Sequence, residues 1–315
     1  MAGAAPGPGP DADADADADQ TVRVLDDSPS LVSLYVRAAL PSIPGAGLLP
    51  GVDIPTSRHD SVPALRLALP GITPDLGHVD AYREVCRLPT REVLPATYLH
   101  LLAFPLHLTL MTDPAFPFAP MGAVHVSNRI EQRQPVGLRE QFDLAVWAED
   151  LRRHRRGRTV TLVSEVSVRD QVVWRDETVL LSRGDGDESE NVEEVHRDLP
   201  EEPPAGPVQW SLPANLGRRY AAVSGDRNPI HLYDVTAKAF GFRRHIAHGM
   251  WTKARCVAEL DNRLPESYAV EVAFRKPIEL PGRVSFGARR GDDHLDFGVR
   301  SGSGRAHLTG RIRPL

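Results

Sequence analysis

Along the chain, segments with apolar residues at helical spacing are followed by segments in which apolar and polar residues alternate, and this succession occurs twice. In the first half a helix is predicted over 26–40, with Ser28 as its N-cap and Pro29 in its first turn. The most apolar stretch, 94–113, predicts a buried helix that Pro105 should kink or end. The first half therefore begins with helices, one of them apolar enough to be enclosed.

Alternation of apolar and polar residues then predicts strands between 122 and 183. The segments 157–170 and 171–183 form the clearest pair and indicate a hairpin. Residues 41–78 are rich in Gly and Pro and are expected to be irregular.

The second half repeats this order of elements. A helix is predicted over 211–226, with Ser211 as N-cap and Pro213 in the first turn, where a missing N–H costs little. A second helix is predicted over 249–260, because its apolar residues recur at helical spacing. The alternating segments that follow predict strands at 268–278, 283–290, 293–300 and 305–313.

Two stretches lack the composition of a packed domain. Residues 1–22 form an Ala/Asp-rich tail that cannot bury apolar surface and is expected to be disordered. Residues 184–208 are acidic and Pro-rich and are expected to form a linker. These stretches divide the chain into an N-terminal unit, 23–183, and a C-terminal unit, 209–315.

A short match between the two halves supports an internal duplication. SNRIEQRQPV (127–136) aligns without gaps to AVEVAFRKPI (269–278), at a constant offset of 142 positions (277 against 135). The match is short, but both segments follow an apolar helix and begin a run of strands. The predicted fold class is therefore α+β, with two units in which a sheet wraps around a long helix. Pairing the two sheets side by side removes one edge from each and imitates a homodimer within one chain.

Composition and charge exclude several classes of protein. The formal net charge is −5, and five Asp lie within the first 20 residues, so the remainder is near neutral and favours no nucleic-acid partner. The basic run at 151–158 is interpreted as a solvated hairpin tip. No apolar run approaches the about 18 residues of a membrane span. Two distant cysteines, Cys86 and Cys256, fit buried thiols in a reducing cytoplasm rather than a disulfide scaffold.

The segment AAVSGDRNPIH holds the densest group of chemically active side chains. Gly225 suits the end of the preceding helix, because a positive φ costs glycine little. Asn228 precedes Pro229, which disfavours helix and makes a turn that the Asn side chain can brace. Such a turn can bring the carboxylate of Asp226 and the imidazole of His231 to face one point.

A facing Asp and His can position one water molecule and exchange protons with it, which is general acid–base chemistry. The alternative is that Asp226 only caps the following helix and His231 packs within it. Downstream, Gly249 stands where a loop becomes a helix, so its N–H would be an unpaired donor at the positive end of the helix dipole. That donor suits the oxygen of a thioester as negative charge develops on it, although close helix packing alone also explains a glycine.

At this point the sequence resembles a known family. YAAVSGDRNPIH, followed 17 residues after His231 by the His of HGM, resembles the signature of the MaoC-like, or type 2 (R-specific), enoyl-CoA hydratases and dehydratases. Residues 216–260 follow that pattern, and FRKPIELPG (274–282) resembles the strand that usually comes next. The resemblance implies a hotdog fold, here in its duplicated, double hotdog form.

The resemblance also implies roles for individual residues. Asp226 and His231 correspond to the catalytic pair, Asn228 braces the turn, and the Gly249 N–H is the thioester oxyanion donor. The implied reaction is reversible hydration of a trans-2-enoyl-CoA to an (R)-3-hydroxyacyl-CoA, within fatty-acid metabolism. His231 is favoured as the base towards water, with Asp226 orienting it or donating, although coupled neighbours titrate as a pair.

The first half has no corresponding motif. Residues 80–100 occupy the place of the catalytic turn and lack the Asp–His pair, which resembles the degenerate hotdog of duplicated family members. That unit would keep the architecture and leave room for a bulky acyl chain. Several basic residues near the motif could meet the phosphates of coenzyme A or of an acyl-carrier group: Arg243, Arg244, Lys253, Arg275 and Lys276. For each of them, a solvated surface charge is the simpler explanation.

Cofactor and partner expectations follow from the same residues. No cofactor is expected beyond the coenzyme A or acyl-carrier thioester. Metal is set aside because no carboxylate or thiol completes a plausible ligand set with His245 and His248 beside His231. Alternatives to the hydratase are a hotdog thioesterase and a non-catalytic acyl-binding subunit. The chain length of the acyl group, and dimerisation beyond the intrachain pair, stay open.

Overall fold

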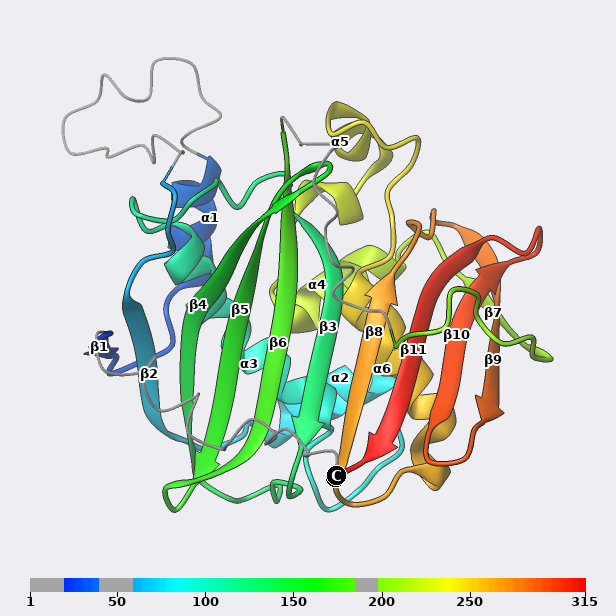
Figure 1. Ribbon diagram of the computed structural model, residues 1–315, viewed down its shortest axis with the longest axis horizontal. Coiled ribbons are helices and arrows are strands. Elements are labelled where there is room, and N and C mark those ends of the chain that lie inside the picture. Colours follow the sequence, from blue (N-terminus) through cyan, green and yellow to red (C-terminus); the bar gives the residue numbers. More distant parts are fainter. Residues whose placement is uncertain (1–19, 40–58, 185–197) are drawn as a thin grey trace, which may run out of the picture.

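The computed structural model describes residues 20–39, 59–184 and 198–315. Its strands form one sheet of 11 strands, in the order β1-β2-β4-β5-β6-β3-β8-β11-β10-β9-β7. The helices α2, α3, α4 and α6 lie against one face of this sheet (Figure 1). The two halves of the chain supply the two sides of the sheet, which confirms the predicted side-by-side pairing.

The N-terminal half builds its side of the sheet mainly from a meander. The elements are β1 (Thr21–Val24), α1 (Leu31–Ala39), β2 (Leu65–Ile72), α2 (Leu76–Cys86), α3 (Ala96–Met111), β3 (Val124–Gln132), β4 (Phe142–His154), β5 (Gly157–Val168) and β6 (Gln171–Arg183). The predicted hairpin is confirmed as β5 and β6, which turn at Arg169 and Asp170 with positive φ.

The C-terminal half repeats the plan with shorter strands. The elements are β7 (Val208–Leu212), α4 (Leu216–Ser224), the 3-10 turn η3 (Pro229–His231), α5 (Asp234–Ala239), α6 (Gly249–Leu260), η4 (Asp261–Arg263), β8 (Tyr268–Phe274), β9 (Gly282–Arg290), β10 (Leu295–Ser301) and β11 (Ala306–Pro314). The helix predicted over 249–260 and all four predicted strands are confirmed, with small shifts at their ends.

The helix α3 is enclosed by the N-terminal sheet, as its apolar sequence predicts. Tyr98, Leu106 and Leu110 are fully buried, and the indole N–H of Trp174 on β6 donates to the Ala96 carbonyl at 3.0 Å. The helix continues through Pro105, so the expectation that it might end there is wrong. Packing on all sides outweighs the lost backbone hydrogen bond, which costs a helix roughly 3 kcal/mol.

Two predicted helix starts lie too early in the sequence. The first helix begins at Leu31 and not near Ser28. Its first backbone hydrogen bond runs from the Leu34 N–H to the Ser30 carbonyl. Ser211 is not an N-cap, because it lies in β7 opposite Arg283 of β9, and α4 begins only at Leu216. Residues 208–212 instead form an edge strand. Their alternation covers only two polar–apolar pairs before Pro213, which is too short a pattern to predict a strand.

Structure also extends into regions expected to be irregular or unstructured. The range 41–78 contains β2 and the start of α2, while its residues 41–58 lie outside the described part of the chain. Within the predicted tail, β1 begins at Thr21 and pairs in parallel with β2. Most of the predicted linker lies outside the described residues, but Leu199 is buried and Pro204 packs against Gly287 of the C-terminal sheet.

The two halves meet at the strand pair β3 and β8, with a register that fits the predicted duplication. Arg129 lies directly opposite Glu271, the residue to which the offset of 142 assigns it. On either side of this point the antiparallel register is symmetric: Asn128 lies opposite Val272, the counterpart of Ile130, and Ile130 lies opposite Val270, the counterpart of Asn128. A pseudo-twofold axis therefore passes between the two strands, as in an isologous dimer.

No helix among the described residues combines the length and apolar character needed to cross a membrane. Both cysteines are buried and unpaired: Cys86 ends α2 and Cys256 lies in α6.

Candidate active site

The segment between α4 and α5 folds as the predicted tight turn. Gly225 caps α4 with φ +72° and donates its N–H to the Ala221 carbonyl. The side-chain oxygen of Asn228 accepts the N–H of Ile230 at 3.3 Å, and Pro229 begins the 3-10 turn that carries His231. The local sequence thus reverses the chain within a few residues, and Asn228 braces the turn as predicted.

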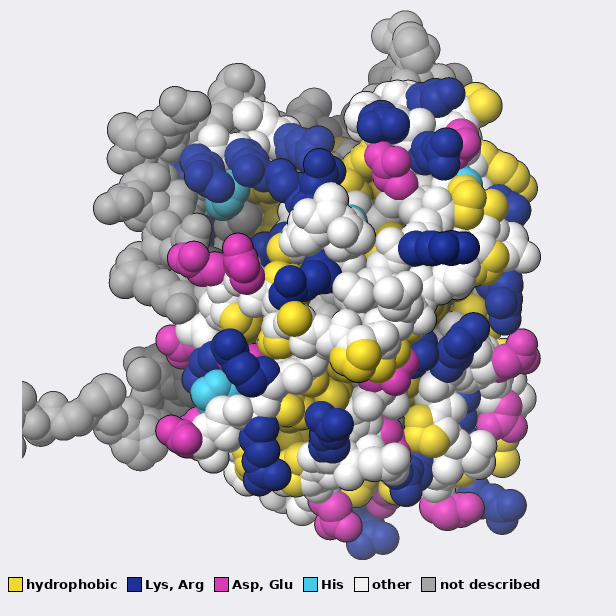
Figure 2. Space-filling view, turned by 90° about the vertical axis from the view of Figure 1, so that its right-hand side faces the viewer, with side chains coloured by type: hydrophobic (Ala, Val, Ile, Leu, Met, Phe, Trp, Pro, Cys, Tyr) yellow, Lys and Arg dark blue, Asp and Glu magenta, His cyan; other side chains and the backbone are white. Residues whose placement is uncertain are grey.

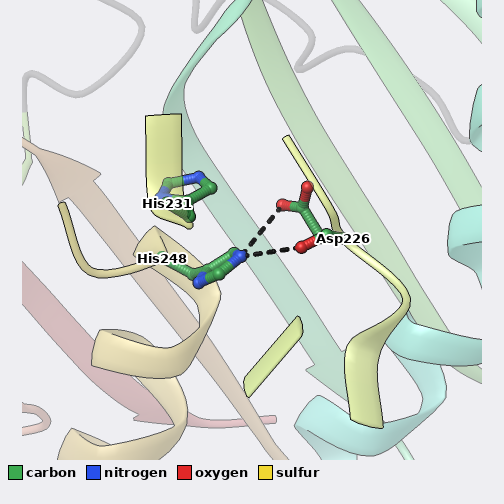
Figure 3. A group of neighbouring side chains, drawn as sticks. All are labelled: Asp226, His231 and His248. Atoms are coloured by element: carbon green, nitrogen blue, oxygen red, sulfur yellow. Dashed lines mark hydrogen bonds and ion pairs between the residues drawn. The ribbon is translucent and has the colours of Figure 1, made fainter. Parts of the chain in front are cut away.

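The turn brings Asp226 and His231 together, and His248 joins them from the start of α6 (Figure 3). The imidazole rings of His231 and His248 stack with centroids 3.7 Å apart. Nε2 of His248 donates to the backbone carbonyl of Asp226 at 3.0 Å and lies 3.8 Å from its carboxylate. The carboxylate and imidazole of the turn and the imidazole of His248 therefore converge on one point.

Hydrogen bonds fix which imidazole nitrogens are free. Nδ1 of His231 donates to the Ile246 carbonyl at 2.8 Å, so a neutral ring leaves a lone pair on Nε2. Nε2 of His248 is engaged by Asp226, whereas its Nδ1 is buried without a partner among the described residues. His231 can therefore act as a base through Nε2, the role the sequence favoured for it.

The electrostatics keep the carboxylate ionised and the two imidazoles neutral. Burial lowers the pKa of His231 and lowers that of His248 to about 3. Burial alone would raise the pKa of Asp226, but His248, His231 and the Asn228 N–H outweigh it and hold the pKa below its usual value. An anion thus stands beside a neutral base, the pairing that proton abstraction from water requires.

Gly249 is the first residue of α6, as predicted, so the helix itself does not use its N–H. The ring of Phe274, at the end of β8, occupies the space beside it: a Cβ added at Gly249 would lie 2.9 Å from this ring. Glycine therefore allows both the close packing of Phe274 and an approach of substrate to the backbone, so the two explanations for this residue are compatible.

A cavity of about 300 Å³ connects these groups. It is lined by Asp226, His231, His248 and Gly249 from the C-terminal half, and by residues of α3, β3, β5 and β6 from the N-terminal half. The half that lacks the motif thus supplies much of the wall, in agreement with the predicted room for an acyl chain.

The basic residues proposed for phosphate contact separate into three groups. Arg275 and Lys276 are exposed and line the cavity, whereas Arg243 and Arg244 are exposed beyond its lining. The prediction for Lys253 is wrong: the residue is fully buried, and its ammonium group donates to the Val270 carbonyl at 3.0 Å and to the Asn128 side chain. Its position on the inner face of α6 places it in the core between the two halves.

Sequence reasoning missed two further basic residues of the cavity. Arg156 lies at the tip of the β4–β5 hairpin and Arg183 at the end of β6; both are exposed and line the cavity. The basic run at 151–158, interpreted from the sequence as a solvated hairpin tip, is the signal that could have indicated Arg156. Lys and Arg side chains gather in the upper part of the face shown in Figure 2.

Tyr35 was also missed, because no pattern linked α1 to the motif 190 residues away. Its hydroxyl accepts the Arg227 N–H at 2.6 Å and donates to the Asp226 carboxylate at 3.4 Å. Leu31, one turn earlier, lies against Gly225, with 2.2 Å between its Cδ1 and the place of a Cβ on that glycine. The helix α1 therefore packs against the outside of the turn at 225–231, and Gly225 leaves room for it.

The structure brings a carboxylate and two histidines together in an arrangement that could hold a metal ion. The expectation set metal aside because no carboxylate would join the histidines, but Asp226 does join His231 and His248, with ligand atoms within 4.8 Å of one another. His245 stands apart, since its ring bonds Asp234 and the Ala214 carbonyl. The donor set is compatible with a cation, but one nitrogen of each clustered ring is already bound to a backbone carbonyl.

Comparisons with known proteins agree with this site. A family model described as "MaoC like domain" matches residues 197–306. The chain is 38% identical over 288 residues to the 3-hydroxyacyl-thioester dehydratase X of Mycobacterium tuberculosis, and the match covers 91% of this chain and 99% of that protein. The chain belongs to the MaoC-like dehydratases.

Solved structures of other dehydratases share the fold of this MaoC-like chain. A crystal structure of the M. tuberculosis dehydratase X matches with TM-score 0.70 and 36% identity, covering 79% of this chain and 100% of that one. A MaoC-like dehydratase from Phytophthora capsici matches with TM-score 0.65 at 14% identity, covering 83% and 98%, and shows the fold alone. A shorter match, 40% over 65 residues, links this chain to the 3-hydroxybutyryl-CoA dehydratase of Methylorubrum extorquens, of which it covers 41%.

Tyr35→Phe tests the contact between α1 and the catalytic turn of this MaoC-like protein. Removing the hydroxyl takes away a hydrogen bond that lowers the pKa of Asp226, so that pKa rises. We expect the acid limb of the pH–rate profile to move to higher pH and kcat to fall severalfold. The control is Val36→Ala, an exposed position on the same helix, which should leave the profile unchanged. An unshifted acid limb in Tyr35→Phe would remove this residue from the site.

Proposed function

We propose that the protein is an (R)-specific enoyl-thioester hydratase, which catalyses the reversible addition of water to a trans-2-enoyl-CoA and, in reverse, dehydration of the 3-hydroxyacyl thioester. The observation that carries the proposal is the convergence of Asp226 and His231 in one cavity with the N-terminal amide of α6. The M. tuberculosis relative, named a 3-hydroxyacyl-thioester dehydratase, supports the same reaction class.

In the proposed reaction each of these groups has a role. The Gly249 N–H polarises the thioester carbonyl, which makes C3 electrophilic. Nε2 of His231 accepts a proton from water as its oxygen attacks C3, and Asp226 orients that water. The proton that C2 gains comes from the same pair, so atoms and charge balance over the cycle. Because the pair is closely coupled, the two residues share one set of apparent pKa values.

The carrier enters past exposed basic side chains. Arg156, Arg183, Arg275 and Lys276 line the cavity and are exposed, which suits the phosphates of coenzyme A or of an acyl-carrier prosthetic group. The carrier thioester is then the partner of this protein, with no nucleic acid involved. The buried free thiols of Cys86 and Cys256 support a reducing compartment, and we propose the cytoplasm.

One experiment separates the hydratase from its alternatives. Purified protein is mixed with enoyl-CoA thioesters of increasing chain length, and loss of the enoyl absorbance, release of free thiol and chirality of the product are followed. The proposal expects an (R)-3-hydroxyacyl-CoA without thiol release. Thiol release would indicate a thioesterase, and binding without turnover would indicate a non-catalytic acyl-binding subunit.

We further propose that the reaction needs no metal or other cofactor. In this account His231 Nε2 serves as the base, and the Gly249 amide supplies the positive charge that a cation would otherwise provide. Dialysis against a strong chelator should therefore leave kcat/KM unchanged, as measured by enoyl-CoA hydration. Loss of activity on chelation, restored by a divalent cation, would instead make Asp226, His231 and His248 a metal centre.

A further inference from the structure

The N-terminal wall of the cavity carries histidines in an otherwise apolar surface. His100 and His107 come from α3 and His125 from β3, and all three line the cavity that holds the catalytic group. Their rings are neighbours, with centroids 5.5 Å apart for His100 and His107 and 6.2 Å for His100 and His125. The surrounding lining is mainly apolar, with Leu101, Phe104 and Met121 among its members. An unbranched hydrocarbon chain has no use for such groups.

Two of the three histidines are held in place by buried partners. Nδ1 of His100 lies 3.0 Å from the carboxylate of Asp176, and Nε2 of His107 lies 2.8 Å from the hydroxyl of Ser164. Burial alone would raise the pKa of Asp176, but His100 outweighs it and the pKa is lowered to about 2. Because a carboxylate only accepts, His100 carries its proton on Nδ1, and its Nε2 is an acceptor when the ring is neutral.

His125 has no such partner. Its Nε2 is buried and forms no hydrogen bond within the described residues. Burial lowers its pKa to about 3, so the ring is neutral near pH 7. A buried polar nitrogen left without a partner destabilises the protein, and a ligand group placed beside it would recover that loss. Thr178, on the neighbouring strand β6, also lines the cavity, but its hydroxyl is already engaged: it accepts from the Asn128 amide at 3.0 Å and donates to the Asp176 carboxylate at 3.3 Å.

Phe274 separates this group from the reacting atoms. One side of its ring lies against His125, with centroids 4.8 Å apart, and the same ring occupies the space beside Gly249. His125 therefore lies one aromatic ring away from the oxyanion amide. It is placed to contact a substrate beyond its thioester and double bond, and not to join the chemistry.

We propose that His125, together with His100, forms a subsite that binds a hydroxyl group on the acyl chain of the thioester. The inference rests on the proposed function and names its substrate class. A hydroxyl both donates and accepts, so it pairs with Nε2 of His125 in either tautomer and can donate to Nε2 of His100. A plain chain of the same length would bury these nitrogens unpaired, and sites built for a hydroxyl discriminate strongly against analogues that lack it.

The test compares pairs of trans-2-enoyl-CoA thioesters of equal length, one plain and one hydroxylated, with the hydroxyl moved along the chain in successive pairs. For at least one position, wild-type protein should prefer the hydroxylated substrate by about tenfold or more in kcat/KM. His125→Phe keeps an aromatic ring against Phe274 and removes the nitrogen, so it should abolish that preference and still hydrate the plain substrate. The matched control, Met121→Leu, changes an apolar residue of the same cavity and should keep the preference.

Three other results are distinguishable. If no hydroxylated substrate is preferred, or if the preference survives in His125→Phe, the subsite proposal is wrong. If His125→Phe weakens plain and hydroxylated CoA substrates equally but spares N-acetylcysteamine thioesters, the group held is an amide of the carrier arm, which also overturns the proposal. If wild-type protein hydrates none of these thioesters, the proposed function itself fails.

Discussion

Replacing His231 with glutamine is expected to lower kcat for enoyl-CoA hydration by about 10²–10⁴-fold, the contribution of a positioned general base. Glutamine keeps a polar side chain of similar length but cannot accept the proton of water at neutral pH. Asp226→Asn should lose a comparable factor, because the amide keeps the acceptor for the Asn228 N–H and removes the charge. Initial rates at saturating substrate, with circular dichroism to confirm folding, measure both losses.

The matched control for this pair is His294→Gln. His294 lies in the turn between β9 and β10, bonds Asp293 and takes no part in lining the cavity. This variant should keep wild-type kcat. If His231→Gln is as active as His294→Gln, the assignment of the base is contradicted.

Gly249→Ala is expected to have the second large effect, a loss of about 10²-fold in kcat. The new Cβ would lie 2.9 Å from the Phe274 ring, so either the first turn of α6 moves and displaces the amide, or the ring moves within the cavity that it lines and displaces the thioester. The backbone at this glycine does not need a positive φ, so stability should change little. Stopped-flow hydration rates and a thermal melt would separate the two effects.

A glycine outside the cavity provides the control. Gly302, in the turn after β10, has nothing within 4 Å of an added Cβ and no positive φ. Gly302→Ala should retain wild-type rates. A Gly249→Ala variant with unchanged kcat would mean that this glycine serves helix packing alone.

Local patterns in the sequence were enough for the elements that carry the catalytic turn. Gly225 permits the positive φ that ends α4, and Pro229 restricts the backbone of Asn228 and its own; together these residues determine the turn that brings Asp226 towards His231. The start of α6 at Gly249 was equally readable, because the apolar spacing of 249–260 continues without interruption. These features are determined by residues adjacent in sequence, so the sequence alone is enough to predict them.

Features that depend on distant neighbours were missed. Tyr35 reaches Asp226 from a helix about 190 residues earlier, and nothing in its local sequence marks that contact. The position of Lys253 beside the motif suggests a surface cation, but the fifth position of α6 faces the core, where the Asn128 side chain of the other half accepts a hydrogen bond from its ammonium group. The ring of His248 was weighed only as a metal ligand, although its stacking on His231 follows once the turn and α6 are placed together.

If Asp226 and His231 act on one water molecule as a unit, substituting both should cost little more than substituting one. Hydration rates are measured for Asp226→Asn, His231→Gln and the combined variant under identical conditions. If both residues serve the same water, the double variant should be about as slow as the slower single variant, because the first substitution already removes the unit. If the two losses multiply instead, the residues act independently, and the single shared water is contradicted.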